Sequence, residues 1–439
     1  MKKIAWLVPH PIKGSGGILN IFQSIQSLSD KYECHVYLEN LDRYSPNVIP
    51  SVEEAHKIIE SYYYEKINAV IHLGLEIDES DNYDLIISTI WYTAKIAADF
   101  NSQCKKAYFI QDYEAMFNPI GDTYIKAENS YRYGLIPITL GRWLSYKLQN
   151  EFGLKTYWYH LCADSAVYHK IEGIKKEKAI CFIYQPEKPR RCSELGIESL
   201  QIVKELMPDV KIYLYGSSAN IPVPFKHTNL DILSIDKCNL LYNKCTVGLC
   251  ISSTNPSRIP FEMMASGLPV VDVYRENNLF DLPEGAVTLA EQTPEAIAYA
   301  ILDILNNPKK QEQMSKNGRD YMKDKTNENI LKHFTKIIDS ILQEDEPEGF
   351  GPIKDKIYML PPVVATDEFI NSVKNSSETI LKAQMKAIQA ELHQMKAIQA
   401  ELQRTQALVE AMRTSKFWKM RTQWFKVKKF LRISNEEEN

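Results

Sequence analysis

The chain has 439 residues, of which 44% are hydrophobic and 25% are charged. These proportions are typical of a globular protein with buried cores, and the length suits about two or three domains. The formal net charge of -4 excludes an overall attraction to nucleic acid, so any basic surface must be local.

The eight cysteines form no C-x-x-C pair and lie in no cluster with zinc-ligand spacing, so we interpret them as reduced thiols and expect no metal site. The apolar run Ile4–Val8 is too short for a signal peptide and stops at a proline. No apolar run is long enough for a transmembrane helix. These features predict a cytoplasmic protein.

Residues 1–170 alternate short apolar runs with amphipathic helical stretches, which predicts a first Rossmann-like α/β domain on the acceptor side. A helix is expected from about residue 18 to residue 28. The expected strands are Ile4–Val8, Glu33–Tyr37, Ala69–His72, Leu85–Ser88 and Lys106–Ile110.

Two segments of this domain carry candidate functional residues. Gly16 and Gly17 lie in a glycine-rich loop after the first strand, where the backbone can approach a ligand and the next helix N-terminus favours an anion. Asp112 and Glu114 follow the fifth strand, where side chains face the ligand crevice of a parallel sheet. We predict a donor-binding role for the glycines and a catalytic role for the carboxylates. A structural turn and a helix cap are the alternatives.

The same alternation restarts in residues 171–345 and predicts a second Rossmann-like domain that binds a nucleotide-sugar. Thr293 and Pro294 mark a helix start, and further helices are expected over 194–206, 261–265, 310–323 and 327–342. The expected strands are Ala179–Ile183, Val210–Tyr215, Thr246–Ile251 and Leu268–Val273. The two domains would face each other across a cleft.

Candidate donor-binding residues follow three of these strands. Arg190 and Arg191 stand before a helix, and guanidinium groups pair with phosphate oxygens. Gly216 closes the next strand. Glu262, expected in the first turn of its helix, can accept hydrogen bonds from ribose hydroxyls, and free N–H groups nearby can bind phosphate. The small polar run before that helix is Asn255, Pro256 and Ser257.

Residues 346–378 are rich in Pro, Gly and acidic residues and predict a linker. Within 379–412 the segment Gln384–Leu392 (QMKAIQAEL) recurs as Gln394–Leu402, with apolar residues at spacings of three and four. The ten-residue shift departs from a strict heptad, so we predict a coiled-coil-like helix. A helix this polar needs a partner helix, which implies a homo-oligomer.

Residues 413–439 are basic and interleaved with aromatic residues. Phe417, Met420, Trp424, Val427 and Leu431 line one face of a predicted helix. Such a helix is typical of an anchor on an anionic membrane surface. The alternative is packing against its own protein or an oligomer partner.

The stretch from Pro260 to Val271, P-F-E-M-M-A-S-G-L-P-V-V, resembles the nucleotide-sugar signature of family 4 glycosyltransferases, which have the GT-B fold. This resemblance implies that Glu262 holds the donor ribose. The family usually has a second glutamate at the position that Thr254 occupies here, so the chain departs from the pattern at that point.

Further segments are similar to bacterial rhamnosyltransferases of surface glycan synthesis, over roughly residues 1–345. This similarity implies a dTDP-L-rhamnose or related deoxysugar donor, retention of configuration, no metal or other cofactor, and a glycan or lipid-linked glycan acceptor at the inner face of the plasma membrane. The segment S-K-F-W-K-M-R in the tail also resembles bacterial polysaccharide enzymes. The motifs are Tyr108–Glu114, Gly134–Leu135, Gly141–Leu144, Pro189–Arg191, Glu194–Gly196 and Asn255–Ser257.

Two other functions remain open. A nucleotide-sugar epimerase of the same fold would need an acid–base pair and no acceptor groove. A non-enzymatic assembly protein would act through its coiled-coil tail, and the missing acid at Thr254 keeps that interpretation open.

Overall fold

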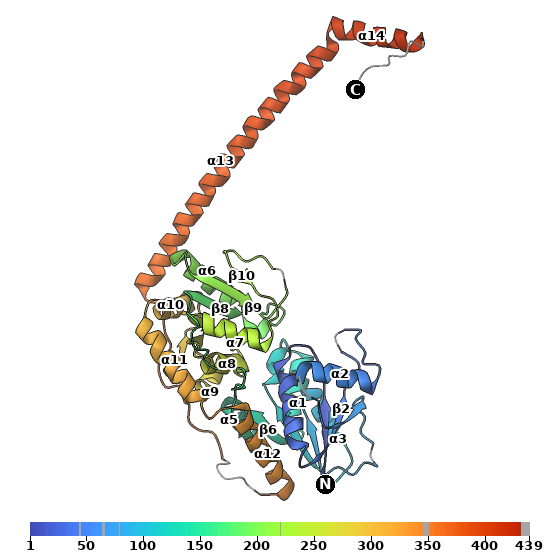
Figure 1. The fold of residues 1–439 in the computed structure, drawn as a ribbon, viewed down its shortest axis with the longest axis vertical. Coiled ribbons are helices and arrows are strands. Elements are labelled where there is room, and N and C mark those ends of the chain that lie inside the picture. Colours follow the sequence, from blue (N-terminus) through green and yellow to red (C-terminus); the bar gives the residue numbers. More distant parts are fainter. Residues whose placement is uncertain (44, 64–65, 79, 220, 346–350, 432–439) are drawn as a thin grey trace. The chain divides into compact units, whose positions relative to one another are not determined.

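The structure is a computed structural model that describes residues 1–43, 45–63, 66–78, 80–219, 221–345 and 351–431. It divides into two units, residues 1–370 and 371–439. The larger unit contains two parallel sheets with helices on both faces of each, as expected from the alternating pattern (Figure 1).

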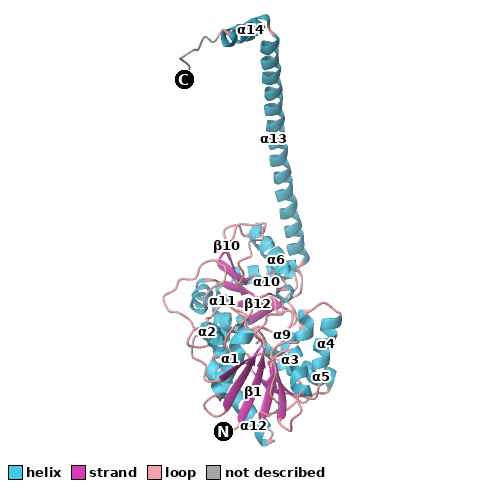
Figure 2. Cartoon of the chain, turned by 90° about the vertical axis from the view of Figure 1, so that its right-hand side faces the viewer, coloured by secondary structure: helices cyan, strands magenta, loops and turns pink. Residues whose placement is uncertain are grey.

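The first sheet has seven parallel strands in the order β3-β2-β1-β4-β5-β6-β7. Strand β1 lies among its neighbours inside this sheet in Figure 2. The interior strand β1 is buried on both faces from Ile4 to Val8, which explains its continuous apolar sequence. The strands are β1 (Lys3–Val8), β2 (Glu33–Leu38), β3 (Val70–Leu73), β4 (Leu85–Ser88), β5 (Lys105–Ile110), β6 (Ile136–Leu140) and β7 (Tyr157–Tyr159).

Two hydrophobic clusters separate the helices of the first domain by face. One cluster takes side chains from α1 (Gly16–Leu28), α2 (Val52–Tyr63) and α12 (Asn327–Gln343). The other takes side chains from α3 (Trp91–Asp99), α4 (Asp122–Ser130) and α5 (Arg142–Phe152).

The second sheet has six parallel strands in the order β10-β9-β8-β11-β12-β13. Helices α6 (Ser193–Leu206) and α10 (Pro294–Leu305) cover one face, and α7 (Ile235–Lys244) and α8 (Arg258–Ala265) cover the other. Helix α11 (Pro308–Met322) packs on α8, and α9 (Glu276–Asp281) packs on α5 of the first domain. The strands are β8 (Ala179–Ile183), β9 (Lys211–Tyr215), β10 (Thr228–Asn229), β11 (Val247–Leu249), β12 (Val270–Val273) and β13 (Val287–Ala290).

Helix α12 follows the second domain in the chain but packs against the first. Phe334 is fully buried against Trp6, Phe109 and Tyr159 of the first domain, and Asp339 binds Lys31. The predicted end of the second domain, residue 345, marks where the alternating pattern ends in the sequence. In the structure, residues 327–343 pack with the first domain.

The predicted strands and helices are found with small shifts, and four short strands were missed. β6 contains Pro137 in its interior, and β7, β10 and β13 are short, so none has a strong period-two pattern. One local prediction is wrong. Helix α8 begins at Arg258 rather than at residue 261, so Glu262 lies in the second turn and not in the first.

The predicted linker has structure of its own. Val363 forms a parallel bridge with Ala290 of β13, and Tyr358 accepts a hydrogen bond from the backbone N–H of Leu289. Helix α13 (Asp367–Thr414) begins inside the predicted linker and continues through the QMKAIQAEL repeat. In the smaller unit α14 (Lys416–Phe430) follows, with the hydroxyl of Ser415 capping its first turn.

Candidate functional site

The two domains meet at the carboxyl ends of their sheets. The loop after β11 touches the residues that follow β5 and β6, because Asn255 donates from its side-chain amide to the carbonyl oxygens of Gln111 and Leu140, each at 2.9 Å. Ligands of open α/β sheets bind beyond the carboxyl ends of the strands. The candidate site is therefore built around this contact.

Asp112 is the main polar link between the domains. Its carboxylate accepts hydrogen bonds from the backbone N–H of Asn255 at 2.9 Å, from the hydroxyl of Thr254 at 2.9 Å and from the N–H of Tyr113 at 2.8 Å. Burial raises the pKa of Asp112, and these bonds and the charge of Arg190 oppose that shift. The structure thus places Asp112 at the domain boundary with its oxygens already bound to the protein.

Helix α8 presents unpartnered polar groups at its start. Ser257 caps the helix by position, but its buried hydroxyl has no hydrogen-bond partner. Nε of Arg258 lies 4.0 Å from a carboxylate oxygen of Glu262 but has no hydrogen-bond partner, and the same guanidinium donates to Gln23 of the first domain at 3.1 Å. Burial raises the pKa of Glu262, which the charge of Arg258 and a hydrogen bond from Tyr168 counteract.

The predicted arginines lie in a short 3-10 helix, η2 (Pro189–Arg191). Burial lowers the pKa of Arg190, whose guanidinium stacks on Phe117 of the first domain at 4.4 Å. The buried Nε of Arg191 has no hydrogen-bond partner, and the charge of Arg191 acts on the carboxylate of Glu262. The structure therefore brings Arg191 and Glu262 into one electrostatic environment, and Arg190 reaches toward Asp112.

A polar network beneath the loop was missed by sequence reasoning. Asp272 in β12 is fully buried and accepts from the N–H and hydroxyl of Ser252 at 2.8 and 2.7 Å. Asn277 donates to the carbonyl oxygen of Ser252 at 2.8 Å, and Asn278 donates to that of Val273 at 2.7 Å. Burial raises the pKa of Asp272 to about 6. These groups fix the loop that carries Asn255 and Ser257. In the sequence, the one indication of this network was an acidic residue, Asp272, inside an apolar strand.

Glu114 lies apart from this set. Its carboxylate accepts from the N–H of Trp91 at 2.6 Å and from the hydroxyl of Tyr108 at 2.9 Å, both within the first domain. Burial raises its pKa to about 8. The geometry gives Glu114 a positioning role at the start of α3, and its predicted catalytic role has no support from these contacts.

Gly16 and Gly17 are the first two residues of α1 rather than part of the loop before it, and Gly216 directly follows β9. Gly17 accepts a hydrogen bond on its carbonyl oxygen from Gln111 at 3.1 Å, and Gly16 begins α1. Gly216 has a φ of +102°, and a Cβ there would lie 2.7 Å from Ile183. Gly216 is therefore required by the turn itself.

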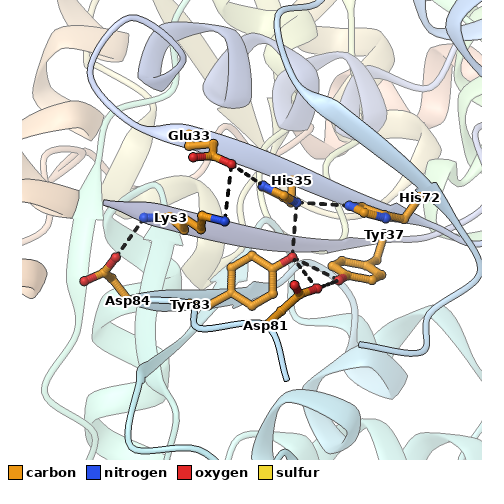
Figure 3. A network of polar contacts seen from close by, with 8 residues as sticks. All are labelled: Lys3, Glu33, His35, Tyr37, His72, Asp81, Tyr83 and Asp84. Atoms are coloured by element: carbon orange, nitrogen blue, oxygen red, sulfur yellow. Dashed lines mark hydrogen bonds and ion pairs between the residues drawn. The ribbon is translucent and has the colours of Figure 1, made fainter. Parts of the chain in front are cut away.

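A second polar cluster lies on the first sheet, on β1 to β3 and in the segment before β4 (Figure 3). His35 and His72 stack at 5.2 Å, and Tyr83 and Glu33 bind the first of these rings. Among the described residues, no group of three or more His, Cys, Asp and Glu side chains is arranged to hold a metal ion. The cluster is Lys3, Glu33, His35, Tyr37, His72, Asp81, Tyr83 and Asp84.

Comparisons with known proteins agree with this architecture. Residues 178–302 match the family described as WsaF, C-terminal domain. The O-antigen biosynthesis protein RfbC of Myxococcus xanthus is 30% identical over 231 residues, which are 51% of this chain but 18% of that protein. The chain thus spans less than a fifth of that relative's length.

Solved structures share the arrangement at low sequence identity. TarM of Staphylococcus aureus, determined with UDP, superposes with a TM-score of 0.61 at 11% identity, over 77% of this chain and 100% of that one. HepE of Anabaena, determined with UDP-glucose, gives a TM-score of 0.59 at 13% identity, over 77% of this chain and 100% of that one.

The two sheets and their facing strand ends define a protein of the GT-B fold, which confirms the fold predicted from the sequence. Within that fold, residues 178–302 are similar to the family described as WsaF, C-terminal domain.

Proposed function

We propose that this protein is a glycosyltransferase that moves a sugar from a nucleotide diphosphate donor to a bacterial surface glycan. The observation that carries the proposal is a set of buried polar atoms without a hydrogen-bond partner, at the start of α8 and in η2, namely Ser257 Oγ, Arg258 Nε, Asn255 Oδ1 and Arg191 Nε. Buried polar groups in folded proteins are nearly always hydrogen-bonded, so a cluster of unpartnered ones indicates a ligand.

The chemistry of these atoms suits a sugar-linked diphosphate. Two guanidinium groups and a helix N-terminus favour an anion, and they would stabilise the diphosphate as it leaves. Glu262, held beside Arg258, would accept hydrogen bonds from the nucleoside ribose. Arg190 spans the domain boundary and would follow domain closure, which excludes water from the donor.

The finer identity of the reaction is also part of the proposal. The similarity to rhamnosyltransferases supports a rhamnose or other deoxyhexose donor such as dTDP-L-rhamnose, transferred with retention and without a metal or other cofactor. Thr254, which replaces the usual acid, donates to Asp112 instead, so the contact between donor sugar and protein would differ from the family pattern.

An epimerase of the same fold is the second candidate, and a non-enzymatic assembly protein is the third. The epimerase would need an acid–base pair at the sugar, yet both carboxylate oxygens of Asp112 and Oε2 of Glu114 already bind protein groups. That observation favours transfer over epimerisation. The unpartnered atoms around α8 favour a ligand-binding enzyme over an assembly protein.

The test begins with a thermal-shift panel of nucleoside diphosphates and their sugars, because a ligand that binds only the folded state raises its melting temperature. The selected donor is then incubated with and without glycan acceptors, with and without EDTA, and the products are identified. Arg191→Ala should weaken nucleotide binding about tenfold to a hundredfold, by loss of charge-assisted bonds. Arg132→Ala, at a side chain 53% exposed in the turn after α4, is the matched control.

An epimerised sugar nucleotide formed without transfer would establish the second candidate in place of the first. Binding of no nucleotide diphosphate by the intact chain would support the assembly protein. Equal nucleotide affinity of Arg191→Ala and Arg132→Ala would contradict the donor site as drawn.

We also infer a partner for the smaller unit. Helix α13 exposes an apolar stripe, and in a parallel in-register pair Glu391 would lie opposite Lys396 of the second helix. We therefore expect the protein to form a homo-oligomer through α13. The test compares the oligomeric state of the full-length wild type and of Ile388→Glu by sedimentation. A monomeric wild type would refute it. The exposed stripe is Leu381, Met385, Ile388, Leu392, Met395, Ile398, Leu402, Val409 and Met412.

Helix α14 exposes aromatic side chains, with Phe417 77% and Trp424 62% exposed, and carries no acidic residue. The described helices include none with the length and apolar character needed to cross a bilayer. We infer that α14 lies on an anionic membrane surface, at the cytoplasmic face where a lipid-linked glycan would be extended. Deletion of residues 413–439 should abolish binding to anionic vesicles and spare nucleotide binding; unchanged vesicle binding would refute the inference.

A further inference from the structure

A group of side chains at the carboxyl edge of the first sheet, separate from the cluster in Figure 3, has no assigned role. Its members are His10, Glu39, Arg43 and Tyr92. We propose that it is the acceptor site, and that His10 accepts the proton of the attacking sugar hydroxyl. This inference rests on the proposed glycosyltransferase function and assigns a residue to its second substrate.

Position in the fold supports a ligand site. His10 follows β1 by two residues, Glu39 follows β2 directly, and Tyr92 lies in the first turn of α3 after β4. These strands are parallel neighbours, with β1 between β2 and β4, so the residues share one edge. The strand order reverses at this point, which is where open α/β sheets form their ligand crevice.

Glu39 holds the cluster together. Its carboxylate, in a residue only 8% exposed, accepts from the N–H of His10 at 3.3 Å, from the hydroxyl of Tyr92 at 2.6 Å and from Nε of Arg43 at 2.6 Å. The guanidinium of Arg43 also lies 3.8 Å from the centre of the Tyr92 ring. The buried carboxylate is thus fully compensated, and it fixes the backbone of His10.

The same residue sets the tautomer of the imidazole. Nδ1 of His10 lies 3.2 Å from the carbonyl oxygen of Glu39. A carbonyl oxygen only accepts hydrogen bonds, so Nδ1 carries the proton and the neutral ring keeps a free electron pair on Nε2. No hydrogen bond joins Nε2 to any other described residue. A half-buried histidine in this state is suited to accept a proton from a hydroxyl.

Two aromatic side chains belong to the same region, because the hydroxyl of Tyr92 and the backbone N–H of His10 bind the same oxygen of Glu39. The rings of Trp91 and Tyr92 stand at 90° with their centres 5.4 Å apart, and both are partly exposed. Sugar-sized ligands combine apolar contacts of this kind with a few fixed polar groups. Glu114 binds the N–H of Trp91, so its positioning role extends to this site.

The cluster also lies near the donor site. Two strand spacings, about 10 Å, separate the end of β1 from the end of β5. Residues Gln111 and Asp112 follow β5 and carry the loop of Asn255 from the second domain. An acceptor sugar bound between His10 and this loop would therefore place its hydroxyl close to both His10 and the anomeric carbon of the donor.

The step balances without another reagent. The acceptor oxygen forms a bond to the anomeric carbon on the face from which the diphosphate departs, as retention requires, and the bond from that carbon to the diphosphate oxygen breaks with its electron pair on the diphosphate. The hydroxyl proton passes to Nε2 of His10 and is then released to solvent.

The experiment compares the full-length wild type with His10→Gln, His10→Asn and the control His393→Gln, an exposed residue of α13. The donor is the sugar nucleotide that the thermal-shift panel selects, and the acceptors are a panel of octyl glycosides. Measurements are kcat with acceptor, donor hydrolysis without acceptor, nucleotide affinity and the pH profile. Asparagine keeps a donor for the Glu39 carbonyl, and glutamine keeps an amide near the place of Nε2, but neither accepts a proton.

We expect kcat with acceptor to fall about 100-fold or more in both His10 variants, with nucleotide affinity and donor hydrolysis unchanged. The acid limb of the pH profile should vanish in these variants. Glu39 and Arg43 face His10 as an ion pair, and burial with Glu39 nearby raises the pKa of Tyr92 far above neutral pH. The control should match the wild type.

Wild-type transfer with an unchanged kcat and pH profile in His10→Gln would overturn the role of His10. A loss of nucleotide affinity together with a fall in kcat would also overturn the role of His10 as proton acceptor. The substitution would then be acting by disturbing the structure. A wild type that binds nucleotide sugar but transfers it to no acceptor would instead remove the proposed function on which the site depends.

Discussion

Replacing Glu114 by glutamine tests whether this carboxyl group is structural or catalytic. Burial raises its folded-state pKa from 4.5 to about 8. In the unfolded chain the group ionises near the lower value. At pH 7 it is therefore protonated in the folded protein and ionised in the unfolded one, a difference that favours unfolding.

The sign and size follow from proton linkage. A raised folded-state pKa gives stability that is fully present below pH 4.5 and is lost as the pH rises through about 8. At pH 7 the loss is about 2.5 pH units at about 1.4 kcal/mol each, or roughly 3 kcal/mol. Glutamine does not ionise, and its carbonyl oxygen can still accept from Trp91 and Tyr108.

We expect Glu114→Gln to be more stable than the wild type at pH 7, by about 1 to 3 kcal/mol after allowing for imperfect hydrogen bonds. The midpoint of thermal unfolding should rise by roughly 2 to 8 °C. The advantage should disappear near pH 4.5 and grow toward pH 8. Glu328→Gln, at a side chain 75% exposed on α12, is the control.

The reasoning would be refuted if Glu114→Gln were less stable than the wild type at pH 7 and the difference did not change with pH. Sugar transfer gives a separate answer. A positioning carboxyl group predicts transfer within about tenfold of the wild type, whereas a catalytic acid or base predicts a loss of about 100-fold or more.

Three further substitutions test the packing that builds the site. Asp112→Ala leaves the buried N–H of Asn255 without an acceptor, so unfolding of the nucleotide-free protein should become easier by about 2 to 4 kcal/mol in a urea titration. Thr254→Glu places a second carboxylate beside Asp112 and should lower the thermal midpoint by several degrees, and more at pH 8 than at pH 5. Gly196→Ala puts a Cβ 2.2 Å from the ring of Phe182 and should cost about 1 to 3 kcal/mol. An unchanged midpoint in any of them would contradict the contact concerned.

Much of the fold was accessible from local pattern. The run from Ile4 to Val8 and the restart at Ala179 predicted the first strand of each sheet, and Thr293 caps its helix as expected by accepting from the N–H of Ala296. Buried parallel strands and capped helices have sequence patterns that can be recognised within a few residues. The missed strand β6 has Pro137 in its interior, and a proline is not expected in the apolar run of a central strand.

The candidate site was predictable only in part. Arg191, Ser257 and Glu262 were predicted as donor-binding residues from their chemistry and their place after parallel strands, and that role stays a prediction. Their surroundings were not: the partner of Asp112 lies 143 positions away in the chain. His10 was overlooked because a lone histidine after a strand carries no local signal, and only its bond to Glu39 gives it chemical meaning.

The sequence by itself determined the two α/β sheets, the helical tail and the residues that follow the strands, because each depends on periodicity and on neighbours along the chain. Tertiary structure alone decided that α12 returns to the first domain, that Glu114 binds Trp91, and that Asp112 holds Thr254. These contacts join residues far apart in the chain. Their energies depend on burial and distance in three dimensions, and no local pattern encodes them.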